Sequence, residues 1–143
     1  MDIALSLAAE AAAAGEAPVG AVIVEDGELL AAERNRMREL GDPTAHAEML
    51  AIRAALSKRG SGRLDGCDLY VTLEPCAMCA GAMAHARVRR VTYGAEDLKA
   101  GAVDHGVRLF ESPNTHHHPE IISGIGATRS SELLKAFFVA KRG

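Results

Sequence analysis

The apolar residues of this chain fall into stretches with helical spacing and short runs typical of strands. Residues 49–56 carry apolar positions at helical spacing. Residues 19–24 form a β-rich run before an Asp26-Gly27 pair, which favours a hairpin turn. Patterns of the first kind predict helices over residues 3–14, 45–58, 76–86 and 130–141. Patterns of the second kind predict strands over 19–24, from 29 onward, and over 68–73, 88–93 and 120–123.

Residues that commonly begin or end helices lie near the boundaries of these stretches. Asp42 and Thr44 are candidate N-caps for the helix over 45–58, and Gly60 lies just beyond its end. Gly15 ends the first helix, and Ser130 begins the last. After one hairpin the predicted elements alternate between helix and strand, which requires some parallel strand pairs. The fold class is therefore α/β, with a partly parallel sheet and helices on its faces.

The composition is that of one ordinary globular domain. The 143 residues are 48% hydrophobic and 24% charged, which excludes intrinsic disorder and collagen-like repeats. With two Tyr, three Phe and no Trp, the core must be built mainly from Ala, Val, Ile and Leu. No apolar run has the length of a membrane span, and no signal-peptide pattern is present. We therefore expect a cytoplasmic protein with no membrane partner.

Charge is distributed unevenly along the chain. The net charge of −3 argues mildly against a nucleic-acid partner. However, residues 1–70 carry 7 Lys/Arg against 12 Asp/Glu, whereas residues 71–143 carry 9 against 7. The second half of the chain can therefore present a basic face.

Two short segments carry residues suited to binding a metal. One is His46-Ala47-Glu48, and the other runs from Pro75 through Cys76 to Cys79 at a predicted helix start. Cysteines three apart share a helix face, so both sulfurs can reach one ion. The positive end of the helix favours their thiolate forms. Two thiolates and one imidazole select zinc over magnesium or calcium, and three protein ligands leave a fourth position for water.

Each of these features also has a simpler interpretation. A Cys-x-x-Cys pair alone fits a redox dithiol or half of a four-ligand structural site. Cys67 is expected to be a small core residue rather than a fourth metal ligand. The run 116–118, three consecutive histidines, is expected to form a polar loop in preference to a metal tract. Met49, Met78 and Met83 lie on helical patterns and are expected in the core.

The combination of the two segments is more specific than either alone. His-x-Glu followed by Pro-Cys-x-x-Cys resembles the signature of zinc deaminases, in which the Glu is the general acid/base and not a ligand. That role falls here on Glu48. Because residues two apart do not share a face of a regular helix, His46 is expected in a first, irregular turn.

On this signature the chain resembles the cytidine deaminase-like superfamily, and within it the enzymes that deaminate adenosine in tRNA. The resembling blocks are 16–22, 35–36, 42–48, 72–83, 93–95, 97–102, 137–138 and 141–142. The resemblance implies one zinc deaminase domain over 1–143, with a three-layer α/β/α fold and a central mixed five-stranded sheet. It also implies one Zn²⁺ per chain, held by His46, Cys76 and Cys79, and a homodimer.

The resemblance extends to residues that contact the substrate. Asn35 corresponds to an amide that hydrogen-bonds the purine, although a turn residue would look the same. Val19 corresponds to an apolar pocket wall, although a core strand residue would look the same. The residues corresponding to those that receive the splayed anticodon nucleotides are Asp97, Lys99, Phe138, Lys141 and Arg142.

The leading hypothesis is therefore a zinc-dependent hydrolase that converts adenosine to inosine at the wobble position of tRNA anticodon loops. The partner would be a tRNA anticodon stem-loop, whose unpaired target base can be splayed out at low cost. One alternative is a deaminase of a free base or nucleoside, such as cytosine or guanine, using the same zinc site. Another is a non-catalytic zinc or redox protein, against which the intact Glu48 argues.

Overall fold

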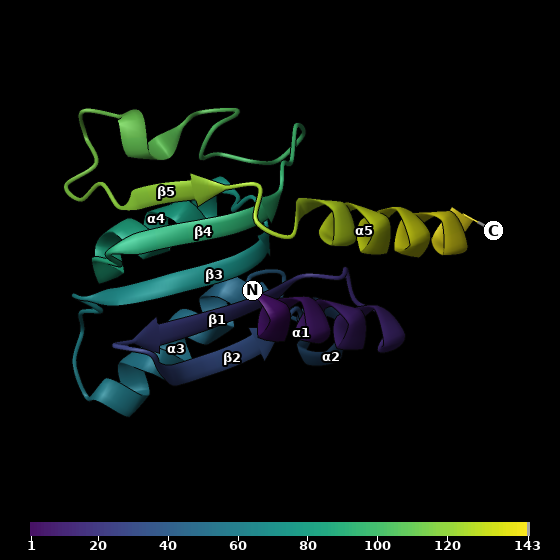
Figure 1. Ribbon diagram of the computed structural model, residues 1–143, viewed down its shortest axis with the longest axis horizontal. Helices are drawn as coiled ribbons and strands as arrows, with labels where there is room; N and C mark the ends of the chain where they lie inside the picture. Colours follow the sequence, from purple (N-terminus) through teal and green to yellow (C-terminus); the bar gives the residue numbers. More distant parts are fainter. Residues whose placement is uncertain (143) are drawn as a thin grey trace.

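A mixed five-stranded sheet forms the centre of the computed structural model, which describes residues 1–142 (Figure 1). Its order is β2-β1-β3-β4-β5. Strand β1 pairs antiparallel with both β2 and β3, whereas β3–β4 and β4–β5 are parallel pairs. The partly parallel sheet expected from the sequence is therefore confirmed. The strands are β1 Gly20–Glu25, β2 Glu28–Arg34, β3 Cys67–Leu73, β4 Arg90–Ala95 and β5 Glu120–Ser123.

Helices cover both faces of the sheet and complete three layers. Figure 1 shows α1 and α5 on one face and α3 and α4 on the other. The helices are α1 Asp2–Ala13, α2 Met37–Leu40, α3 Ala47–Arg59, α4 Ala77–Ala86 and α5 Ala127–Arg142, with a short 3-10 helix, η1, at Leu109–Glu111. Among residues 1–142, no helix combines the length and the apolarity needed to cross a membrane.

Aliphatic side chains form most of the core, as the composition indicates, with Tyr93 as a fully buried aromatic residue. Between the sheet and α3 and α4, the buried residues include Ala51, Ile52, Ala55, Leu69, Val71, Met83 and Tyr93. On the other face α1 lies directly against β1 through Ala4, Ala8 and Ala11, all of which are buried. A Cβ added to Gly20 would lie only 2.0 Å from the carbonyl oxygen of Ala4. Close contact between α1 and β1 therefore requires glycine at position 20.

The predicted helix starts need two corrections. Helix α3 begins at Ala47, and neither Asp42 nor Thr44 caps it, because Asp42 Oδ1 instead accepts hydrogen bonds from the amide and hydroxyl of Thr44. Helix α5 begins at Ala127, three residues before Ser130. Ser130 is buried within the helix, and its hydroxyl donates to the Thr72 carbonyl at 2.6 Å. Neither residue therefore marks a helix start, because Asp42 bonds to the nearby Thr44 and Ser130 bonds to Thr72 on β3.

Other differences concern short elements and one side chain. The sequence pattern did not indicate α2 or η1, which are only four and three residues long. Met83 is buried as expected and Met49 is partly buried, but Met78 is 36% exposed and does not belong to the core. Met78 lies in the first turn of α4, on the side facing solvent.

The contact between α1 and β1 gives a test of the fold. In Gly20→Ala the backbone of α1 must move, because overpacking a tight contact typically costs about 1–3 kcal/mol. We expect the free energy of unfolding in urea to fall by at least about 2 kcal/mol. Gly62→Ala is the matched control, since its Cβ would meet nothing within 4 Å. An equal loss in both variants would contradict the close packing of α1.

Candidate active site

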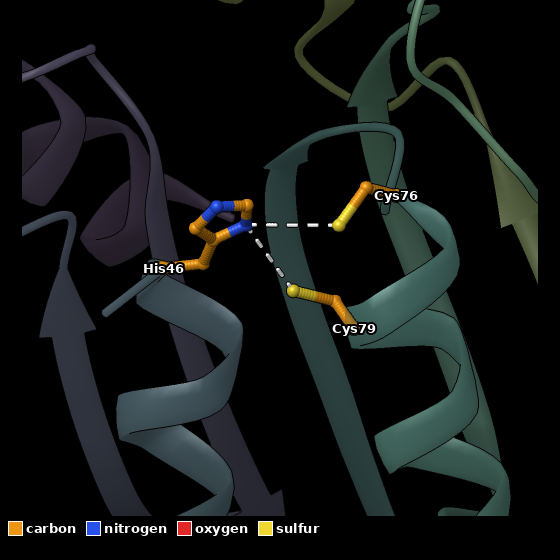
Figure 2. A group of neighbouring side chains, drawn as sticks. All are labelled: His46, Cys76 and Cys79. Carbon is orange, nitrogen blue, oxygen red and sulfur yellow. Dashed lines mark hydrogen bonds between the residues drawn. The ribbon is translucent and has the colours of Figure 1, made fainter. Parts of the chain in front are cut away.

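The two predicted metal-binding segments meet at the starts of α3 and α4. His46 lies immediately before α3 with extended backbone angles, φ −71° and ψ 150°. Cys76 holds the same position before α4, and Cys79 lies in that helix's first turn. The His46 Nδ1 atom lies 3.7 Å from Cys76 Sγ and 3.5 Å from Cys79 Sγ (Figure 2). The expected irregular position of His46 is confirmed.

The distances among these atoms fit one tetrahedral zinc ion. Zinc bonds of about 2.3 Å to sulfur and about 2.0 Å to nitrogen place the two ligand atoms about 3.5 Å apart. The three ligand atoms all lie within 4.8 Å of one another. Within residues 1–142, His46, Cys76 and Cys79 form the group that could hold a metal. Three protein ligands leave a coordination position open, as in catalytic zinc sites.

The other candidate ligands lie outside this group. Cys67 is fully buried in the core, and its sulfur accepts a hydrogen bond from Arg59 Nη1 at 3.2 Å. His117 Nε2 donates to the Val88 carbonyl at 2.6 Å, and His118 Nδ1 donates to the Phe110 carbonyl. The run 116–118 therefore forms the polar loop expected for it, and Cys67 is the core residue expected.

Local interactions favour the thiolate form of one of the two cysteines, Cys76. A hydrogen bond from the Cys79 thiol, together with one from His46, lowers the pKa of Cys76 to about 4. The same contact with Cys76, and burial, raise the pKa of Cys79. The hydrogen bond to Cys76 also raises the pKa of His46. Cys76 is therefore a thiolate at neutral pH, the form that binds zinc.

Glu48 lies in the first turn of α3, two residues after His46. Its side chain is almost fully buried, and this burial raises the pKa of Glu48 to about 7. A carboxyl group with such a pKa can both accept and donate a proton near neutral pH. Glu48 lines the same pocket as His46 and Cys76, so its proton is available to a molecule bound there.

A pocket of about 730 Å³ opens over these residues. This volume is in the range typical of small-molecule sites. Besides His46, Glu48 and Cys76, the pocket is lined by Leu73 and Glu74 at the end of β3 and by residues from four other parts of the chain. These include Ala17 and Val19 before β1, Asn35 and Met37 around α2, residues 96–100 after β4, and Leu134, Lys135, Phe138, Val139 and Arg142 of α5.

Most of the predicted substrate residues line this pocket, and one does not. Val19, Asn35, Asp97, Lys99, Phe138 and Arg142 all contribute to its lining. Lys141 is outside the lining, and its Nζ lies 5.4 Å from the centre of the Phe137 ring, a cation–π contact. Asp97 Oδ1 accepts hydrogen bonds from the amides of Lys99 and Ala100, so it also shapes the turn that carries Lys99.

The amide of Asn35 has a defined orientation. Its Oδ1 accepts a hydrogen bond of 2.9 Å from the Ala47 N–H, the first amide of α3. Asn35 therefore supplies the N-terminal cap that the sequence pattern had placed on Asp42 or Thr44. Because this bond fixes the oxygen toward α3, the side chain has its NH₂ group, a hydrogen-bond donor, to present to a molecule in the pocket.

Two buried carboxylates, Glu74 in the pocket lining and Glu16 outside it, were assigned no individual role from the sequence. Glu74, fully buried, accepts hydrogen bonds from backbone amides between residues 97 and 105. Burial alone would raise the pKa of Glu74, but these hydrogen bonds outweigh it and lower the pKa. Glu16 Oε1 and Oε2 accept from the amides of Arg38 and Glu39 at the start of α2. In the sequence, the only sign of these two residues was that each is a charged residue next to an apolar run.

Comparison with known proteins agrees with this geometry. Residues 1–95 match the family described as the cytidine and deoxycytidylate deaminase zinc-binding region. A tRNA-specific adenosine deaminase of Agrobacterium fabrum is 52% identical over 142 residues, covering 99% of this chain and 93% of that protein.

Solved structures share the same fold. One, from a study of A-to-I editing by tRNA:A34 deaminases at the wobble position of transfer RNA, has a TM-score of 0.92 and 52% identity, covering 94% of this chain and 97% of the other. A guanine deaminase from Nitrosomonas europaea has a TM-score of 0.78 and 25% identity, covering 96% and 82%. The chain therefore belongs to the cytidine and deoxycytidylate deaminase zinc-binding family and, within it, to the group of tRNA-specific adenosine deaminases.

Proposed function

We propose that this protein is a zinc-dependent hydrolytic deaminase that converts adenosine to inosine at the wobble position of tRNA anticodon loops. The observation that carries the proposal is the placement of buried Glu48 beside the His46, Cys76 and Cys79 group, in one pocket. The 52% identity to a tRNA-specific adenosine deaminase over nearly the whole chain supports the choice of substrate. We infer that residues 1–143 act as one domain and that the enzyme works in the cytoplasm as a homodimer.

His46, Cys76 and Cys79 would hold the zinc ion. When bound, zinc supplies the nucleophile of a hydrolysis by bringing the pKa of a water molecule close to neutrality. Glu48 takes the proton that the water loses as its oxygen adds to C6 of adenine, and passes it to the adjacent ring nitrogen. Glu48 then assists protonation of the amino group, which leaves as ammonia as the C6–N bond breaks. Water is consumed, and inosine and ammonia are formed.

Asn35 and Val19 would orient the base. The Asn35 NH₂ group can donate to an acceptor on the purine, because its oxygen is already bonded to the Ala47 amide. Val19 is buried to all but 6% of its surface and offers an apolar wall against the ring. Together these contacts would hold C6 toward the metal group.

The mouth of the pocket suits a polynucleotide better than a free base. Leu98 is 76% exposed and Phe138 is 47% exposed, although both are apolar. Exposed aromatic side chains commonly stack on unpaired bases. Lys99, Lys135 and Arg142 line the same pocket and can contact backbone phosphates. The exposed apolar residues would then be covered by the nucleotides that flank the target base.

The same zinc site could instead serve a free base, as the likeness to a guanine deaminase indicates. A direct assay separates the two. The purified zinc-loaded protein is incubated with an anticodon stem-loop carrying adenosine at the wobble position and, separately, with adenosine, cytosine and guanine, and inosine and ammonia are measured. We expect inosine from the stem-loop alone. Efficient release of ammonia from guanine, with no inosine from RNA, would overturn the tRNA assignment.

Zinc content tests the ligand set. Cys76→Ser removes a thiolate whose geometry fits a tetrahedral site, so we expect it to purify with little zinc. The matched control is Cys67→Ser, which alters a buried cysteine outside the group and should retain about one zinc per chain. Metal analysis of both proteins checks this. Loss of zinc from the Cys67 variant would indicate a closed site and contradict the catalytic interpretation.

Glu48→Gln tests the proton transfer. The amide keeps the size of the side chain but cannot shuttle a proton, so turnover should fall by at least about 10²–10⁴-fold. Zinc content and the urea unfolding curve should stay close to those of the wild type. The measurement is single-turnover inosine formation alongside metal analysis. Near-normal turnover would mean that another group carries the protons.

The salt dependence of binding tests the RNA contacts. Each phosphate contact in single-stranded RNA adds about −0.7 to the slope of log affinity against log salt. Replacing Lys99 and Arg142 together by Ala should therefore flatten the slope for an anticodon stem-loop by about 1.4. Lys58→Ala is the control, because its Nζ donates to the Leu29 carbonyl, away from the pocket lining. An unchanged slope in the double variant would place the RNA elsewhere.

A further inference from the structure

Glu74 is a buried anion whose partners are almost all backbone amides. Its Oε2 accepts from the amides of Val103, Asp104 and His105 at 3.0–3.2 Å. Its Oε1 accepts from the Asp97 amide at 3.1 Å and from His105 Nδ1 at 2.7 Å. No lysine or arginine is paired with it among the described residues 1–142, so amide dipoles and one imidazole stabilise its charge.

The segment that surrounds this carboxylate, residues 96–105, is here called the wall loop. Its first five residues, 96–100, line the pocket. The loop folds tightly around the carboxylate, and a Cβ added to Gly101 would lie 2.5 Å from Glu74 Cδ. That Cβ would also lie 2.4 Å from the Asp97 carbonyl oxygen. The absence of a side chain at Gly101 is therefore required for the loop to close on Glu74.

The same short segment positions both the metal group and the wall loop. Glu74 lies two residues before Cys76, and the Glu74 amide donates to the Ala95 carbonyl at 2.8 Å. The Pro75 carbonyl accepts from the Ala102 amide at 2.9 Å. The position of Leu98 and Lys99 relative to the metal group is thus set through Glu74 and Pro75.

We propose that Glu74 is a positioning residue that holds the wall loop in the shape that binds the nucleotides flanking the target base. The inference rests on the proposed function for its substrate, but the ordering of the loop can be measured without one. Glu74 itself lines the pocket, but in this role it acts through the loop and not on the metal ligands or the reacting atoms. Its loss should weaken binding of the RNA and leave the chemical step intact, which appears as a raised KM with an unchanged kcat.

Glu74→Gln changes the carboxylate in a defined way. The glutamine oxygen can take the position of Oε2 and keep the three amides of residues 103–105. Its NH₂ group then replaces Oε1, and His105 Nδ1 can accept from it in its other tautomer. The Asp97 amide, however, loses its acceptor and meets a donor. The variant should therefore loosen the beginning of the wall loop, where Leu98 and Lys99 lie, more than its end.

Two measurements on the zinc-loaded protein test this proposal. Hydrogen exchange should show faster exchange of the amides of residues 97–101 in Glu74→Gln, with little change in α3 and α4. Steady-state kinetics with an anticodon stem-loop should show KM raised about tenfold, the size of effect expected for one unmet buried amide. The value of kcat should stay within about twofold, and zinc content should be unchanged. His105→Ala, which removes one donor to Oε1, should raise KM less.

The matched control is Asp68→Asn, near the start of β3, the strand that leads to Glu74. Asp68 is also a largely buried carboxylate, paired with Arg89 at 2.6 Å, but it lies outside the pocket lining. This variant should lower the free energy of unfolding without changing KM or exchange in the wall loop. Unchanged exchange in Glu74→Gln, or equal rises in KM in Glu74→Gln and Asp68→Asn, would overturn the proposal. A wild-type protein inactive on RNA would refute the proposed function, while the exchange result would still decide the role of Glu74.

Discussion

The site requires two helices to begin side by side, so that three ligand atoms from separate parts of the chain meet at one point. Strands β2 and β3 both run antiparallel to β1, and they therefore run in the same direction. The segments that leave their carboxyl ends lead to α3 and α4, whose first residues emerge at the same edge of the sheet. His46 and Cys76 both precede a helix there, with extended backbone angles. The shared direction of β2 and β3 therefore brings the metal-binding residues together.

The parts of the site that the sequence predicted are those whose geometry is local. Cys76 and Cys79 share a helix face because they are three residues apart, and this spacing can be seen in the sequence alone. The joint occurrence of the His46 and Cys76 segments indicated a single metal group, although only the sheet order brings them together. For the same reason the strands and long helices were predicted well, since each has its own spacing of apolar residues.

What the sequence did not predict depends on contacts between distant residues. The cap of α3 comes from Asn35, twelve residues before the amide that it accepts from, so the nearer Asp42 and Thr44 were better candidates on spacing alone. Which residues of α5 line the pocket depends on where that helix docks against the sheet, so spacing alone did not show that Arg142 lines it whereas Lys141 lies against the Phe137 ring. The partners of Glu74 lie more than twenty residues away.

The double role of Asn35 constrains how this pocket can evolve. One side-chain amide accepts from the first amide of the helix that follows His46 and, in the proposed function, would also present its donor group to the substrate. A mutation at Asn35 that alters the choice of base also removes the cap of α3, so a new specificity gained there brings a less ordered metal group with it. Ala17 and Val19 line the pocket without such a side-chain bond. Substitutions at these two positions can therefore change the range of substrates with the least effect on the metal-binding group.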